Sequence, residues 1–128
     1  MMDFRPYTAR NAKLCVGQCE ALPGYRAGIA VENQNRGKLY FDEIIHNMVD
    51  HEKVHRATAA MGTQSIYFKN GSLLEIFVAS ENACRRKFDE LIIEPQIRQE
   101  IVWNVLAHLV MPMYLRKWWG HQTHEKKG

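Results

Sequence analysis

The sequence has no long apolar run, no leader-like N-terminus and no regular framework of cysteines. No apolar stretch approaches the ~18 residues that a membrane-spanning helix requires, and the opening MMDFRPYTAR lacks the apolar core of a signal peptide. The three cysteines are an odd number, which argues against a disulfide framework and for a reducing compartment. We therefore expect a cytoplasmic protein without a membrane segment, in which Cys15 and Cys19 are buried free thiols.

Internal repeats and low-complexity segments are also absent from the sequence. A chain of 128 residues is large enough for one domain with a single core, and we expect that domain over residues 1–115. A basic tail over residues 116–128 follows, in which cations beside Trp118 and Trp119 suit phosphate contacts and base stacking. The alternative for this tail is a partly ordered terminus with one tryptophan packed against the domain.

Hydrophobic periodicity and turn residues divide the chain into alternating helices and strands. In chain order they predict a helix over 12–22, a strand over 26–32, a helix over 37–49, a hairpin over 65–80, a strand over 88–95 and a helix over 96–111. The hairpin has the most specific signal, because Asn70-Gly71 favours the positive φ angles of a tight turn. Leu91, Ile92 and Ile93 are consecutive apolar residues, as in strands with both faces covered. The alternation predicts an α/β fold with a small, mainly parallel sheet, a β-hairpin and flanking helices.

One short stretch matches a metal-site motif. His51-Glu52-Lys53-Val54-His55 fits the zinc-protease pattern H-E-x-x-H. On a helix, residues four apart lie on one face, so His51 and His55 could hold one Zn²⁺ while Glu52 serves as the base that activates a bound water. The stretch therefore keeps a small zinc metallopeptidase open as an alternative function.

This zinc site has structural requirements. Residues 41–56 must form one continuous helix, and a third ligand must come from the last helix, where Glu100 and His108 are the candidates. The charged neighbours favour instead a solvated helix end without metal; they are Asp50, Lys53 and Arg56.

A spaced pattern of residues runs through the hairpin and the strand that follows it. Its members are Phe68, Asn70, Gly71, Ser72, Ser80, Asn82, Phe88, Asp89, Leu91, Ile92 and Ile93. This pattern resembles the middle of the ATPase domain of phage terminase large subunits, the motors that package DNA. In that family an apolar strand precedes Asn-Gly-Ser, a Ser-x-Asn loop follows the next strand, and a further apolar strand forms the Walker B motif. The resemblance covers most of residues 10–112 and is most specific over 66–94.

The resemblance implies a P-loop-NTPase-like fold, ATP with Mg²⁺ as ligands, and double-stranded DNA and other packaging proteins as partners in a bacterial host cell. It implies that Lys13 is the candidate nucleotide-binding residue and that Glu94 stands at the Walker-B-like position. It also places residues 51–55 in a variable connection, with no reason to bind zinc.

The sequence departs from the family where the chemistry lies. No glycine precedes Lys13, and Leu14 stands where a serine or threonine would bind Mg²⁺. Glu94 and Pro95 stand where the Walker B motif has aspartate and the glutamate that polarises water. Cys84 likewise displaces the arginine of the arginine-glycine loop. We therefore expect a degenerate module that is not an active motor by itself, and enzymatic activity is left open.

Arg85, Arg86 and Lys87 form a basic cluster just before the predicted strand. They are the candidate residues for contact with DNA phosphates, and the alternative is a solvated loop. A non-catalytic interaction module is a third possible function, because nothing in the sequence excludes it.

Overall fold

The computed structural model describes residues 4–60, 62–80, 87–104 and 106–109. The elements, in chain order, are β1 (Phe4–Pro6), α1 (Ala9–Ala21), β2 (Arg26–Val31), α2 (Gln34–Asn47), the 3₁₀ helix η1 (His51–Lys53), β3 (Val54–Ala60), β4 (Thr63–Phe68), β5 (Leu73–Val78), β6 (Glu90–Ile93), α3 (Gln99–Asn104) and the 3₁₀ helix η2 (Leu106–Leu109). None of the helices in these ranges is long and apolar enough to span a membrane.

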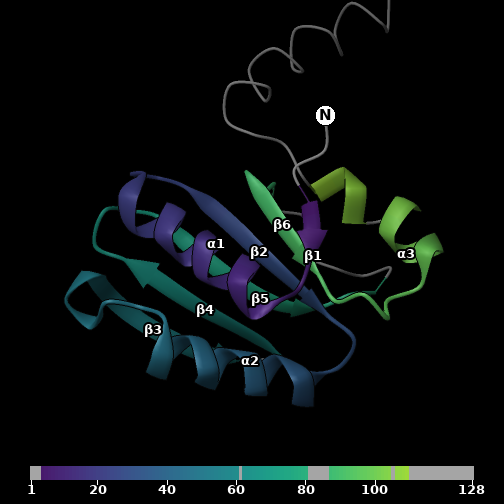
Figure 1. The fold of residues 1–128 in the computed structure, drawn as a ribbon, viewed down its shortest axis with the longest axis horizontal. Helices are drawn as coiled ribbons and strands as arrows, with labels where there is room; N and C mark the ends of the chain where they lie inside the picture. Colours follow the sequence, from purple (N-terminus) through teal and green to yellow (C-terminus); the bar gives the residue numbers. More distant parts are fainter. Residues whose placement is uncertain (1–3, 61, 81–86, 105, 110–128) are drawn as a thin grey trace, which may run out of the picture.

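The strands form one mixed sheet of six, in the order β1-β6-β2-β5-β4-β3. The first four strands in that order run parallel to one another, whereas β4 pairs antiparallel with both β5 and β3. The predicted α/β class is confirmed, and so is the combination of parallel strands with a hairpin. Strand β6, which carries the apolar run Leu91–Ile93, lies between two parallel neighbours, β1 and β2 (Figure 1).

Helices α1 and α2 lie on one face of this sheet, and α3 with η2 lies on the other (Figure 1). Strand β6 contributes to both apolar layers. Ile92 packs beneath α1 and α2, while Leu91 and Ile93 pack with the α3–η2 segment. Successive side chains of a strand point to opposite faces, so three consecutive apolar residues are needed where both faces are covered.

The predicted Asn70-Gly71 turn joins β4 to β5 and also fixes the end of α1. Gly71 has a φ of 87°, and the Phe68 N–H donates to the Ser72 carbonyl at 3.0 Å, which leaves a three-residue loop with glycine in its last position. The Asn70 side-chain amide donates to the Cys19 carbonyl at 2.9 Å, and the Ser72 hydroxyl donates to the same oxygen at 2.5 Å. These side chains satisfy a carbonyl that the end of a helix leaves without a partner.

Cys15 and Cys19 are free thiols on the buried face of α1, as the sequence predicts. Two edge strands were not predicted. Strand β1 is only three residues long, and β3 is mostly exposed, so neither carries the alternating apolar pattern that marks a strand in a sequence.

The single helix predicted over 96–111 is wrong for the described residues. α3 begins only at Gln99, and a separate 3₁₀ helix follows it. The N–H of Ile97 donates to the Glu94 carbonyl at 3.1 Å in a turn that directs the chain back over the sheet. The Leu109 carbonyl then accepts from the Phe88 N–H at 2.6 Å. Packing against the sheet therefore shapes this segment more strongly than its helical periodicity does.

The continuous helix over 41–56 that the zinc alternative requires is not formed. α2 ends at Asn47, and the Asp50 carboxylate accepts from the Glu52 N–H at 3.1 Å to start η1. From Val54 the chain is extended and pairs with β4. Pairing with β4 and the Asp50 cap thus replace the helical continuation.

Candidate functional site

The carboxyl ends of β1, β6 and β2 meet at one edge of the sheet. The chain leaves β1 and β2 toward the face covered by α1 and α2, and it leaves β6 toward the opposite face, where α3 lies (Figure 1). Parallel strands whose connections diverge in this way mark the usual position of ligand sites in open α/β sheets. This edge is therefore the candidate functional site.

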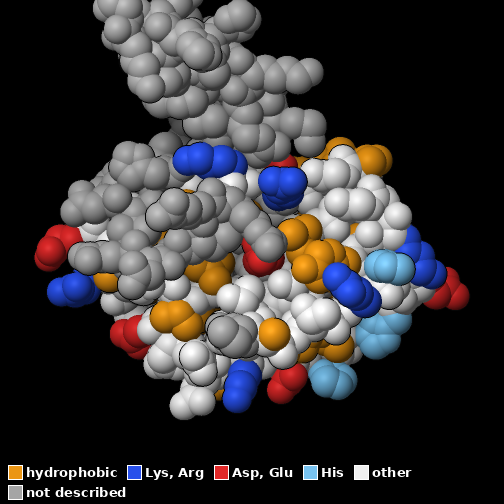
Figure 2. All heavy atoms as spheres, turned by 180° about the vertical axis from the view of Figure 1, so that it is seen from behind, with side chains coloured by type: hydrophobic (Ala, Val, Ile, Leu, Met, Phe, Trp, Pro, Cys, Tyr) orange, Lys and Arg blue, Asp and Glu red, His pale blue; other side chains and the backbone are white. Residues whose placement is uncertain are grey.

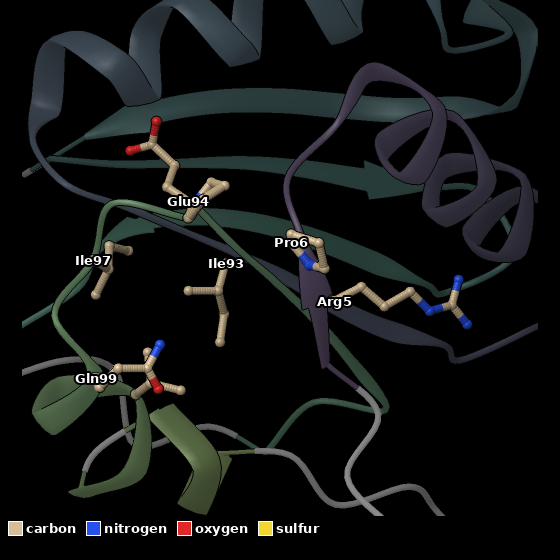
Figure 3. Close-up of a pocket in the computed structure, with 8 residues that line it drawn as sticks. Arg5, Pro6, Ile93, Glu94, Ile97 and Gln99 are labelled. Carbon is tan, nitrogen blue, oxygen red and sulfur yellow. The ribbon is translucent and has the colours of Figure 1, made fainter.

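Glu94 lies at this edge, directly after β6. Its side chain is fully buried, and in Figure 3 its carboxylate points away from Ile93 and Ile97. One carboxylate oxygen accepts from the backbone N–H of Glu32 at 2.7 Å. The other oxygen accepts from three side chains, the guanidinium of Arg36, the hydroxyl of Tyr40 and, at 3.0 Å, the amide of Gln96.

These donors decide the charge of Glu94. Burial alone raises the pKa of its carboxyl group, but the hydrogen bonds from Tyr40, the Glu32 N–H, Arg36 and Gln96 together outweigh it, so the pKa lies below its ordinary value of 4.5. The same contacts raise the pKa of Arg36, chiefly through its hydrogen bond to Glu94. Burial, together with the hydrogen bond to Glu94, raises the pKa of Tyr40. At neutral pH the site therefore contains a carboxylate paired with a guanidinium.

Tyr40 is itself held in place by two contacts. Its ring stacks on the ring of Tyr7 with centroids 4.0 Å apart, and its hydroxyl accepts from the Arg36 guanidinium at 3.0 Å. Tyr7 belongs to the short connection between β1 and α1, so the cluster joins all three strand ends. Arg36 and Tyr40 lie four residues apart on α2, which places both on one helical face.

Sequence reasoning missed these partners of Glu94. The i,i+4 spacing of Arg36 and Tyr40 could have indicated a shared face, and Asn33, whose side chain accepts from the Arg36 N–H, is a recognisable N-cap. However, Arg36 is 58 residues away from Glu94 in the chain, and only the pairing of β2 with β6 brings them together.

A pocket of about 190 Å³ lies next to Glu94, on the α3 side of β6 (Figure 3). Its apolar walls come from Pro6, Ile93, Pro95, Ile97 and Val102. Arg5 lines it too, but its side chain is directed away from the pocket in Figure 3, and its guanidinium pairs with Glu90 at 3.7 Å. The pocket is smaller than the roughly 300–1,000 Å³ typical of small-molecule sites.

Lys13, the predicted nucleotide-binding residue, is the fifth residue of α1 and is exposed. It lines a different groove, between α1 and α2, together with Arg10 and Glu43. Only Tyr7 and Thr8 separate β1 from α1, whereas a phosphate-binding loop needs several residues to wrap its N–H groups around phosphates. The position of Lys13 therefore differs from that of a phosphate-loop lysine at a helix start.

The residues of the zinc alternative lie on different elements. His51 is in η1, where its Nε2 is 2.6 Å from the Ile45 carbonyl, and His55 is in β3. Glu100 is exposed on α3, and His108 belongs to η2. α3 packs against β6, which is next to the β1 edge of the sheet. β3 is the edge strand at the other end of the strand order. No group of three potential metal ligands occurs among the described residues.

Of the predicted DNA contacts, Arg85 and Arg86 lie outside the described residues, as does the tail over 116–128. Lys87 is half-buried and stands at the amino end of β6, the end opposite to Glu94. Lys87 and Glu94 therefore lie at opposite ends of β6.

Comparisons of the chain with protein-family models, curated proteins and solved structures found no match.

Proposed function

We propose that the chain is a phage terminase-like α/β domain, related to P-loop NTPases, that associates with double-stranded DNA and has a degenerate nucleotide site. The observation that carries this proposal is Glu94. It follows a buried parallel strand at the Walker-B-like position, and both of its carboxylate oxygens accept hydrogen bonds from the chain itself.

The hydrogen bonds to both oxygens of the Glu94 carboxylate explain why this site would not drive ATP hydrolysis. A Walker B acid orients Mg²⁺, which requires an oxygen directed at the ion or its waters. Arg36 already supplies a positive charge to Glu94, so it takes the role that the metal has in an active site. Pro95 follows, and it has no side-chain group that could polarise water.

The strand arrangement supports the terminase-like part of the proposal. The Walker-B-like strand has a parallel neighbour on each side, and β1 leads into a helix on the sheet face opposite to α3. A packaging-related domain that has lost nucleotide chemistry would retain contact with DNA, and the formal charge of +3 is compatible with such contact.

Binding of a fluorescently labelled DNA duplex of about 20 base pairs, measured by anisotropy at several salt concentrations, tests this proposal. We expect binding at low salt that weakens steeply as salt rises, because Lys and Arg contacts to phosphates release counterions. Adding ATP together with Mg²⁺ should change the affinity no more than Mg²⁺ alone does at the same ionic strength. No binding at about 50 mM salt would contradict the proposal and would favour the non-catalytic interaction module.

A further inference from the structure

The His51–His55 stretch, which does not form a zinc helix, forms a bulge at the edge of the sheet. Val54 pairs with Phe68 and Arg56 pairs with Tyr67, so the chain advances two residues on β3 while it advances one on β4. His55 is therefore an extra residue, and His55 and Arg56 together oppose Tyr67. Such bulges redirect side chains, and they are over-represented at sheet edges and next to active sites.

Cationic side chains gather around this bulge. The N–H of Lys69 donates to the Lys53 carbonyl at 2.8 Å, so the β4–β5 turn lies beside η1. Lys53, His55, Arg56 and Lys69 are all exposed. Figure 2, which views the sheet from behind, shows basic and histidine side chains together at its right-hand side, where η1 and β3 lie. We call Lys53, His55, Arg56, Tyr67 and Lys69 the bulge surface.

Arg56 lies over the ring of Tyr67, with its guanidinium carbon 4.7 Å from the ring centroid. A stacked guanidinium keeps its N–H donors free at the rim, where they can bind phosphate oxygens. The same stacking covers one face of the ring, so that face is not open to a nucleic-acid base. The arrangement therefore suits backbone phosphates of a duplex better than the unstacked bases of a single strand.

Three acidic residues accompany these cations, namely Glu20, Glu52 and the exposed Asp50, which caps η1. Glu20 and Glu52 line the hollow between Lys53 and Lys69. The Glu20 carboxylate accepts from the Asp50 N–H at 2.7 Å, which ties it to the η1 turn. Glu52 is exposed, and its negative charge opposes an approaching phosphate.

We propose that the bulge surface is the face of this domain that binds the phosphate backbone of double-stranded DNA. This inference rests on the proposed function, and it names residues other than the Arg85–Lys87 cluster. The three permanent cations, Lys53, Arg56 and Lys69, make the phosphate contacts. Tyr67 positions Arg56 from beneath.

Salt-dependent duplex binding by a triple variant tests this assignment. In Lys53→Gln, Arg56→Gln, Lys69→Gln, the slope of log affinity against log salt becomes shallower by about 0.9 for each phosphate that is no longer neutralised, or about 2.7 for three. The matched control changes three exposed cations elsewhere, Arg10→Gln, Lys38→Gln and Arg98→Gln, and removes the same net charge. It should change the slope by less than about 1. Thermal melting checks that both variants are folded.

Removing a negative charge from the same surface should have the opposite effect on DNA affinity. Glu52→Gln removes the exposed acid beside Lys53 and should tighten duplex binding about two- to fivefold at low salt. If wild-type protein binds duplex DNA and both triple variants weaken equally, the bulge surface is not the binding face, but the proposed DNA association stands. If wild-type protein does not bind, both proposals fail.

Discussion

Glu94→Gln lowers the free energy of unfolding by about 2–4 kcal/mol at neutral pH, which is among the largest effects expected for a single residue here. The substitution keeps the volume of the side chain, so it creates no cavity. It replaces a carboxylate that accepts from Arg36, Tyr40, Gln96 and the Glu32 N–H with an amide that has one acceptor oxygen. Hydrogen bonds to a buried charge contribute more than neutral ones. Urea unfolding followed by circular dichroism measures the loss.

Glu100→Gln is the matched control, because Glu100 is an exposed acid on α3 and the same substitution there should change stability by less than about 0.5 kcal/mol. Equal effects of the two substitutions would show that the Glu94 contacts do not stabilise the fold.

The effect of Glu94→Gln depends on pH in a defined direction. The pKa of Glu94 in the folded protein lies below its ordinary value of 4.5. Its stabilising contribution is therefore complete above pH 4.5 and is lost as the pH falls through the lowered folded pKa. The difference between wild type and variant should consequently shrink on acidification below pH 4.5. A difference that is the same at neutral pH and at about pH 3 would exclude the charge of Glu94 as its cause.

Gly28→Val should destabilise the domain by about 2–3 kcal/mol. Gly28 lies in β2, between β5 and β6, and a Cβ at this position would stand 3.0 Å from Leu91 Cδ1 and 3.0 Å from Phe88 Cζ. Both neighbours belong to the buried layer under α3, where a branched side chain has no free volume. The free energy of unfolding from urea denaturation checks the prediction.

Gly17→Ala is the control with the opposite sign. A Cβ at Gly17 meets nothing within 4 Å, and Gly17 is an exposed residue inside α1. Alanine there should raise stability by about 0.5–1 kcal/mol, because glycine is a poor helix former. If both substitutions destabilise the domain to the same extent, the packing against Gly28 is not the reason.

The fold could be predicted where local pattern and tertiary position agree. The apolar run at Leu91–Ile93 indicated a strand covered on both faces, and Asn70-Gly71 indicated the hairpin. Strand β3 was not predicted, because an edge strand with exposed faces needs no alternation of apolar and polar residues. The bulge at His55 further interrupts the two-residue periodicity of the strand. The match of residues 51–55 to a zinc motif carried no information about their conformation.

Of the residues gathered at the candidate site, the sequence analysis named only Glu94, which the terminase resemblance puts at the Walker-B-like position. Its partners come from α2, from the connection after β2 and from Gln96. Such contacts depend on which strands become neighbours, and the strand order is a global property of the chain. The bulge surface depends likewise on β3 pairing with β4, which no local signal predicts.

We infer that the chain's own donors, from Arg36, Tyr40, Gln96 and the Glu32 N–H, engage the Glu94 carboxylate in place of Mg²⁺ and nucleotide. The most direct test is the melting temperature of the wild-type protein with and without about 1 mM ATP and Mg²⁺, a concentration on the order of 100 times the Kd of a functional site. We predict no shift. Binding at such a site stabilises the folded state by about 2.7 kcal/mol, so a rise of more than about 5 °C would contradict the account.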